Sequence, residues 1–236
     1  MKKSTSPPAV IPHGFTYINS LHQAPFYQKK SIFNKALSGN DLRLLGDSLS
    51  SLHQMAQCYP KCKGGAHILE SILGRAYNNA CGAILLAQSG LYDECLTLVR
   101  GIGECANLIM LVQSVKSEGM KWQGIDPKDE WKEFSPAKVR KKMKIHNVPI
   151  PMEEVEYSEL CGFVHLNKKS EPNNHSDGKQ SGFLGVIYQE NGYVSSFAKI
   201  TEHVTTLAML GSKATGRDDL FDLIKSTLVK LGRVPE

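Results

Sequence analysis

An arginine and a glutamate one helical turn apart lie in the most apolar stretch of the chain. Arg100, Glu104 and Asn107 fall within residues 91–117, LYDECLTLVRGIGECANLIMLVQSVKS, which contain no proline. Residues three and four apart share one face of a helix, so the spacing predicts a polar stripe on an otherwise apolar helix. A buried charge needs a partner because desolvating an isolated charge is costly. The stripe therefore predicts either a guanidinium that binds an anion and is oriented by Glu104, or a structural ion pair.

A second group of candidate residues ends in a histidine, in the segment YSELCGFVHLNKK. Ser158 and His165 share one face of a predicted helix, Tyr157 is next to Ser158, and Lys168 belongs to the basic run that follows. If this helix packs on the central one, His165 approaches Arg100. An imidazole that moves a proton beside a guanidinium that holds a phosphate suits the cleavage of RNA. The alternative is a histidine that caps a helix or packs in the core.

A basic segment, residues 135–146, is predicted to be a helix that begins with Ser135 as N-cap and Pro136 at the first helical position. It contains Lys141 and several other basic residues. One interpretation is a solvated helix face, which is typical of charge runs. The other is a strip that contacts phosphates, so Lys141 is a candidate for RNA binding.

Four residues have side chains that zinc accepts: His53, Cys58, Cys62 and His67. Their spacing is H-x4-C-x3-C-x4-H, in which the cysteines are further apart than in established zinc motifs and Pro60 lies between them. We therefore predict no metal site and no other cofactor.

The composition is that of an ordinary globular protein, with 41% hydrophobic and 22% charged residues. A net charge of +5 is compatible with a nucleic-acid partner but does not demand one. The N-terminal lysines are not followed by the apolar segment of a signal peptide, and no apolar run approaches the roughly 18 residues of a membrane span. A cytoplasmic protein with no membrane partner is expected.

Helical periodicity dominates the chain, so the predicted fold is mainly α, a bundle of about six or seven helices with one small β-hairpin. The hairpin is predicted over 183–196, where FLGVIY and YVSSF flank an Asn-Gly turn signal. Close packing of the helices over 66–88 and 91–117 as an antiparallel pair is expected, because small residues such as Gly82, Gly101 and Gly103 lie on them. Seven helices are predicted over 40–57, 66–88, 91–117, 135–146, 152–164, 196–214 and 218–231, and 127–134 is a candidate for a further short helix.

Prolines and aromatic residues predict an irregular N-terminal arm over 1–37. Residues 38–236 are predicted to form a single helical domain. Within it, 118–150 is a basic insertion whose first part, marked by Gly119, Gly124 and Pro127, is expected to be a loop.

Two motifs, YDECxxLxRxxxExxNL over 92–108 and YSxxCxxVH over 157–165, resemble those of a family of bacterial all-helical proteins of unknown function. That family is similar in character to the HEPN superfamily, helical domains of toxin–antitoxin and phage-defence systems. Many HEPN domains are metal-independent ribonucleases that act as dimers. They carry their arginine and histidine on a single helix, whereas Arg100 and His165 are far apart in this sequence.

The sequence thus predicts a HEPN-like RNA-binding or RNA-cleaving protein of a bacterial defence or toxin–antitoxin module, acting as a homodimer. Its catalytic residues would be Arg100, Glu104 and His165, and its binding residues Asn107, Tyr157, Ser158, Lys141 and Lys168. One alternative is a non-catalytic helical interaction protein that binds a partner protein and has a structural Arg–Glu–His network. A further alternative is a sensor of a small ligand or nucleotide.

Overall fold

The computed structural model describes residues 39–57, 67–164 and 189–235, and these form nine helices and no strand. The prediction of a mainly α fold is confirmed, but six or seven helices are too few even for the described residues. The helices are α2 (Gly39–Ala56), α3 (Ile68–Gln88), α4 (Tyr92–Ser114), α5 (Lys116–Gly124), α6 (Pro127–Phe134), α7 (Pro136–Ile145), α8 (Glu154–Val164), α10 (Glu190–Ala214) and α11 (Asp218–Lys230).

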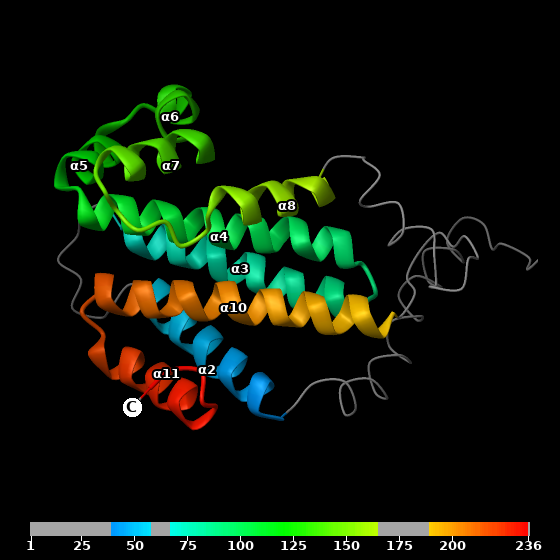
Figure 1. Cartoon of the computed structure of the whole chain (residues 1–236). Helices are drawn as coiled ribbons and strands as arrows, with labels where there is room; N and C mark the ends of the chain where they lie inside the picture. The colour runs from blue at the N-terminus through cyan, green and yellow to red at the C-terminus, as the bar shows by residue number, and fades with distance from the viewer. Residues whose placement is uncertain (1–38, 58–66, 165–188, 236) are drawn as a thin grey trace, which may run out of the picture.

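Helices α3 and α4 lie side by side in the middle of the molecule, as the sequence predicts (Figure 1). They are joined by a short turn in which Gly90 has a φ of 78°. A Cβ at Gly82 would lie 2.8 Å from Leu98, and one at Gly101 would lie 2.7 Å from the Asn79 side chain. These two glycines therefore allow the close approach of the two helices. Gly103 instead faces Met152, in the segment before α8.

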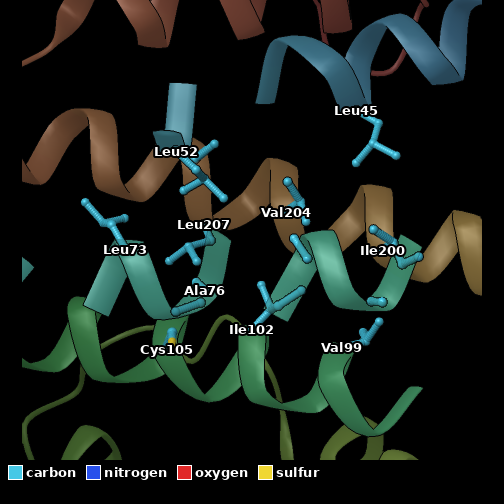
Figure 2. Close-up of a cluster of buried hydrophobic side chains, with 14 of the residues drawn as sticks. Leu45, Leu52, Leu73, Ala76, Val99, Ile102, Cys105, Ile200, Val204 and Leu207 are labelled. Atoms are coloured by element: carbon cyan, nitrogen blue, oxygen red, sulfur yellow. The ribbon is translucent and has the colours of Figure 1, made fainter. Parts of the chain in front are cut away.

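The main core lies where α3 and α4 meet α10 and α2 (Figure 2). Its fully buried side chains include Leu52, Leu73, Ala76, Val99, Ile102, Ile200, Val204 and Leu207. Length and composition alone would allow α4 to cross a membrane, but 61% of its apolar window is buried inside the protein. This burial is what a core helix of a soluble protein also shows, so α4 is weak evidence for a membrane span.

The predicted β-hairpin is wrong where the structure describes it. Gln189 precedes α10, and residues 191–192 of the expected turn lie in its first turn. Tyr193 and Phe197 are both buried, one helical turn apart, with ring centroids at 4.7 Å. The backbone N–H of Gln189 donates to the Tyr92 hydroxyl at 3.0 Å. Packing against α4 therefore outweighs the local preference of Asn-Gly for a tight turn. Residues 183–188 of the hairpin lie outside the described residues.

The predicted loop after residue 118 is also wrong, because α5 occupies most of it. The Lys142 ammonium contacts the Glu118 carboxylate at 2.5 Å, and the Trp122 ring meets the Phe134 ring edge-on with centroids 4.9 Å apart. These contacts from α6 and α7 hold a helix that contains two glycines. A small second core of Leu111, Phe134, Val139, Met143 and Val148 joins α6 and α7 to α4, and Trp122 of α5 packs against it. The division into an arm over 1–37 and one domain over 38–236 stays a prediction, and the arm lies outside the described residues.

Candidate functional site

Arg100 and Glu104 form the ion pair that their spacing predicts. Arg100 Nε lies 3.3 Å from Glu104 Oε1, and the two side chains are 22% and 27% exposed. Nε is buried and makes no hydrogen bond to any described residue, so the contact is an ion pair without a well-directed hydrogen bond. Arg100 Nη1 donates to Cys161 Sγ at 3.6 Å. The α4 stripe therefore does meet α8, the helix whose C-terminal end precedes His165.

Tyr157 lies beside two guanidinium groups. The Arg140 guanidinium carbon is 3.8 Å from the centre of the Tyr157 ring, and that of Arg100 is 5.9 Å away. Arg140 is 2% exposed; its Nε donates to Glu154 at 3.3 Å, whereas its buried Nη1 has no partner among the described residues. Burial, and next a hydrogen bond with Cys161, raise the pKa of Tyr157. The sequence predicted Arg140 only as one of the basic residues of the helix over 135–146, although it follows the core residue Val139 in α7.

Asn107 is hydrogen-bonded to the protein backbone at both ends of its amide side chain, and its predicted binding role stays a prediction. Its Nδ2 donates to the Met152 carbonyl at 3.0 Å, and its Oδ1 accepts the Met152 backbone N–H at 2.9 Å. Because the side chain is 2% exposed, both ends of the amide are used inside the protein. Ser158 and Lys141 are exposed on α8 and α7. The structure thus brings Arg100, Glu104 and Tyr157 together and leaves Ser158 and Lys141 at the surface.

Two predicted site residues, His165 and Lys168, lie outside the described residues, as do Cys58 and Cys62 of the possible zinc set. The other two members of that set have protein partners. His53 contacts Gln57 at 3.1 Å, and His67 lies 3.5 Å from Glu70. Within the described ranges there is no cluster of three or more residues that could hold a metal ion.

A cleft of about 740 Å³ opens on the other side of Glu104, between α3, α4 and helices α5–α7. One part of its lining is aromatic and includes Trp122, Trp131 and Phe134. These include both tryptophans of the chain, and Trp131 is 74% exposed. The polar part of the lining includes Arg75, Asn79 and Glu104. Its volume is in the range of pockets that hold small molecules or nucleotides.

Glu104 links the cleft to the arginine pair. Burial raises the pKa of its carboxyl group, and the positive charges of Arg100, Arg140 and Arg75 oppose this rise only in part. Arg75 and Asn79 are four residues apart on α3 and share its cleft-facing side with Ile72. The cleft therefore combines aromatic faces with one poorly solvated carboxylate and nearby hydrogen-bond donors. The cleft was not predicted from the sequence, because its lining comes from five helices.

A second polar cluster, Glu156, Lys199 and His203, lies between α8 and α10 and was also missed. His203 is 4% exposed, and its Nε2 lies 3.2 Å from Glu156 Oε1, which also accepts from Lys199 Nζ. Burial lowers the pKa of His203 despite the neighbouring carboxylate. Burial also acts to raise the pKa of Glu156, but Lys199 and His203 outweigh it and the pKa is lowered. The signal in the sequence is a lysine and a histidine one turn apart within an apolar helix.

Comparison with known proteins did not identify a relative of this chain. No protein-family model matches the chain, no curated protein matches it, and no solved structure matches it. The resemblance to HEPN-like proteins consequently stays a prediction. The cleft and the arginines next to it are the features from which a function can be inferred.

Proposed function

We propose that this protein binds single-stranded RNA in the cleft between α3, α4 and α5–α7. The observation that carries the proposal is the position of both tryptophans in one cleft together with Arg75 and Glu104. Unpaired bases stack on aromatic side chains, and each such contact contributes about 1–3 kcal/mol to binding. Trp131, with most of its surface exposed, is available for stacking.

The charges around the cleft support a phosphate-containing ligand. Arg75 is exposed and has no ion-pair partner within the described part of the chain. Lys141 and Lys144 are exposed on α7, whose residues Pro136 and Val139 line the cleft. Phosphate contacts of this kind provide affinity that does not depend on base sequence and that falls with added salt. Lys142 contributes less, because it is already paired with Glu118.

RNA cleavage, as in the HEPN-like proteins that the motifs resemble, extends the proposal. Arg100 would hold the phosphate, Glu104 would orient the Arg100 guanidinium, and His165 would act as acid and base. The support is the contact of Arg100 with Cys161, which is four residues before His165 in the sequence. A role as a homodimer in a defence or toxin–antitoxin module belongs to the same extension.

A second candidate, a non-catalytic helical interaction protein, is favoured by the internal contacts of Arg100. Its described partners are Glu104, Cys161 and Tyr157, all of the same chain. In that case, replacing Arg100 changes stability and leaves RNA binding and RNA integrity as they are.

The test is fluorescence polarisation of a labelled, unstructured RNA with the purified full-length protein. Trp131→Ala is expected to weaken binding roughly 5- to 100-fold through loss of a stacked base. Arg75→Ala should weaken binding and reduce its salt dependence. Arg43→Ala, which removes an exposed arginine of α2 outside the cleft, is the matched control. Unchanged affinity in both cleft variants would overturn the proposal.

The cleavage extension is tested separately on a denaturing gel. Wild-type protein is incubated with the RNA alongside Arg100→Ala and His165→Ala, in the presence of a chelator. Cleavage by the wild type that both substitutions abolish supports the extension. RNA that stays intact with the wild-type protein contradicts the cleavage extension. The proposal of RNA binding is tested separately by the fluorescence polarisation experiment.

A further inference from the structure

We infer that the cleft selects guanine among the four RNA bases, with the Glu104 carboxylate as the selecting group. This inference rests on the proposed RNA binding and names the preferred ligand of the same cleft. It depends on the chemistry of Glu104 and of its neighbours in the lining.

An ionised carboxylate offers two acceptor oxygens and no donor. Guanine is the RNA base whose Watson–Crick edge carries two adjacent donors, the N1–H and the N2 amino group. Adenine and cytosine each offer one amino group beside an acceptor nitrogen, and uracil offers one N–H between two carbonyls. A carboxylate at the end of a base-binding cleft is therefore matched to guanine and mismatched to the other three.

The groups around Glu104 complete this match. Guanine has the O6 and N7 acceptors next to its donor edge, and Asn79 and Arg75 provide donors in the same cleft. The Asn79 side chain is held close to the α4 backbone at Gly101, three residues before Glu104. Trp122 and Trp131 provide the aromatic faces on which a purine stacks well.

Glu104 is a better selecting group than Glu130, the other carboxylate of the lining. Glu130 is exposed on α6, so water competes for its oxygens. The Glu104 side chain is 27% exposed, so burial raises its pKa, and the positive charges of Arg100, Arg140 and Arg75 oppose this rise and favour the ionised form. Hydrogen bonds to a partly desolvated charged acceptor are stronger than those in water.

The experiment measures binding of five short RNAs by the full-length protein through its intrinsic fluorescence. Both tryptophans line the cleft, so quenching reports on this site. The probes are UUGUU, UUAUU, UUCUU, UUUUU and UUIUU, where I is inosine. Inosine keeps the N1–H of guanine and lacks the N2 amino group. We expect UUGUU to bind about tenfold more tightly than the other four.

Glu104→Gln, whose amide replaces one acceptor oxygen by a donor, is expected to abolish the preference for UUGUU. Glu94→Gln, an exposed residue of the same helix outside the cleft, is the matched control and should keep the preference. Circular dichroism checks that each variant is folded. The inosine probe tests the same contact in the wild-type protein, so the inference remains testable if Glu104→Gln does not fold.

The outcomes separate this inference from the proposed function. If no RNA binds, the proposal of RNA binding fails. If all five RNAs bind with equal affinity, RNA binding stands and guanine selection is overturned. Equal binding of UUIUU and UUGUU contradicts the two-donor contact. Loss of the preference in Glu130→Gln but not in Glu104→Gln overturns the assignment to Glu104.

Discussion

Two carboxylates, Glu104 on α4 and Glu156 on α8, are similarly buried, with 27% and 21% of their side chains exposed, and their pKa values shift in opposite directions. Lys199 and His203 contact Glu156 directly and lower its pKa in spite of burial. Glu104 has Arg100 at 3.3 Å without a hydrogen bond, and burial raises its pKa. The Lys199 ammonium and the His203 imidazole thus satisfy one carboxylate by direct contact, while the other retains acceptor capacity beside a cleft.

Two amides repeat this contrast. Both line the cleft, but Asn107 uses both ends of its side chain on the Met152 backbone, whereas no such backbone contact is described for Asn79. Glu156 and Asn107 are hydrogen-bonded to protein partners, whereas Glu104 and Asn79 line a cleft that a ligand can enter. Polar residues inside a helical bundle therefore indicate a binding site only when the protein leaves them unsatisfied. Four predictions test this contrast.

Among the polar residues of this contrast, the largest effect is expected for Asn107→Ala. The substitution leaves the buried N–H and carbonyl of Met152 without partners, each at a cost of about 1–3 kcal/mol. The free energy of unfolding should fall by about 3 kcal/mol, which lowers Tm by roughly 6–12 °C in a protein of this size. Thermal unfolding followed by circular dichroism measures it. The paired variant Asn79→Ala should change Tm far less. An equal fall in Tm for the two variants would show that Asn107 and Asn79 do not differ in how the protein satisfies them.

A smaller loss of about 1–2 kcal/mol is expected for Glu156→Gln, because Lys199 and the buried His203 lose a charged acceptor. Urea unfolding measures the change. Glu202→Gln provides a matched control, since Glu202 is exposed and pairs with the same lysine at 3.3 Å. Equal effects of the two substitutions would show that burial of the cluster adds nothing.

Stability is expected to fall as the pH is lowered from 7.5 to 5.5. Because the pKa of His203 is lowered in the folded protein, the unfolded chain takes up a proton below the ordinary histidine value of about 6.5 while the native state does not. Glu104 acts in the opposite sense, since a raised pKa favours the folded state as the pH falls. Urea midpoints across this range should show a decline that is reduced in His203→Gln. A decline of the same size in that variant would assign it to other groups.

The smallest effect on stability is expected for Trp131→Ala, within about 0.5 kcal/mol of the wild type, because the side chain is largely exposed. Phe134→Ala, in the same cleft but buried in the second core, should cost about 3 kcal/mol or more. Urea unfolding of both variants gives the comparison. A large loss of unfolding free energy in Trp131→Ala would show that this tryptophan stabilises the fold and is not available for a ligand.

The sequence predicted most helices well because their apolar residues recur with helical period and their ends carry clear signals. Helix α6 begins at Pro127 and ends at Phe134, as expected, with Asp126 as N-cap accepting from the Lys128 N–H at 3.0 Å. The pairing of Arg100 with Glu104 was also predictable, since residues four apart on one helix meet without help from the rest of the chain.

The errors arose where distant residues decide the structure. The Asn-Gly pair near residue 191 is helical because Tyr92, far away in the sequence, packs against the start of α10. The hydrogen bonds between Asn107 and Met152 were not predicted, because the sequence does not show that Met152 lies opposite Asn107. The combination of Trp131 with Arg75 in one cleft has no signature in local spacing.

By itself, the sequence determined the helical class, most helix positions and the ion pair within α4, because these depend on residues within one or two turns of each other. Only the tertiary structure decided which polar groups are satisfied and which remain available. That outcome depends on the partners that other helices bring to each side chain, as the opposite pKa shifts of Glu104 and Glu156 illustrate. Hydrogen-bond satisfaction is a property of packed neighbours, and a linear pattern does not contain it.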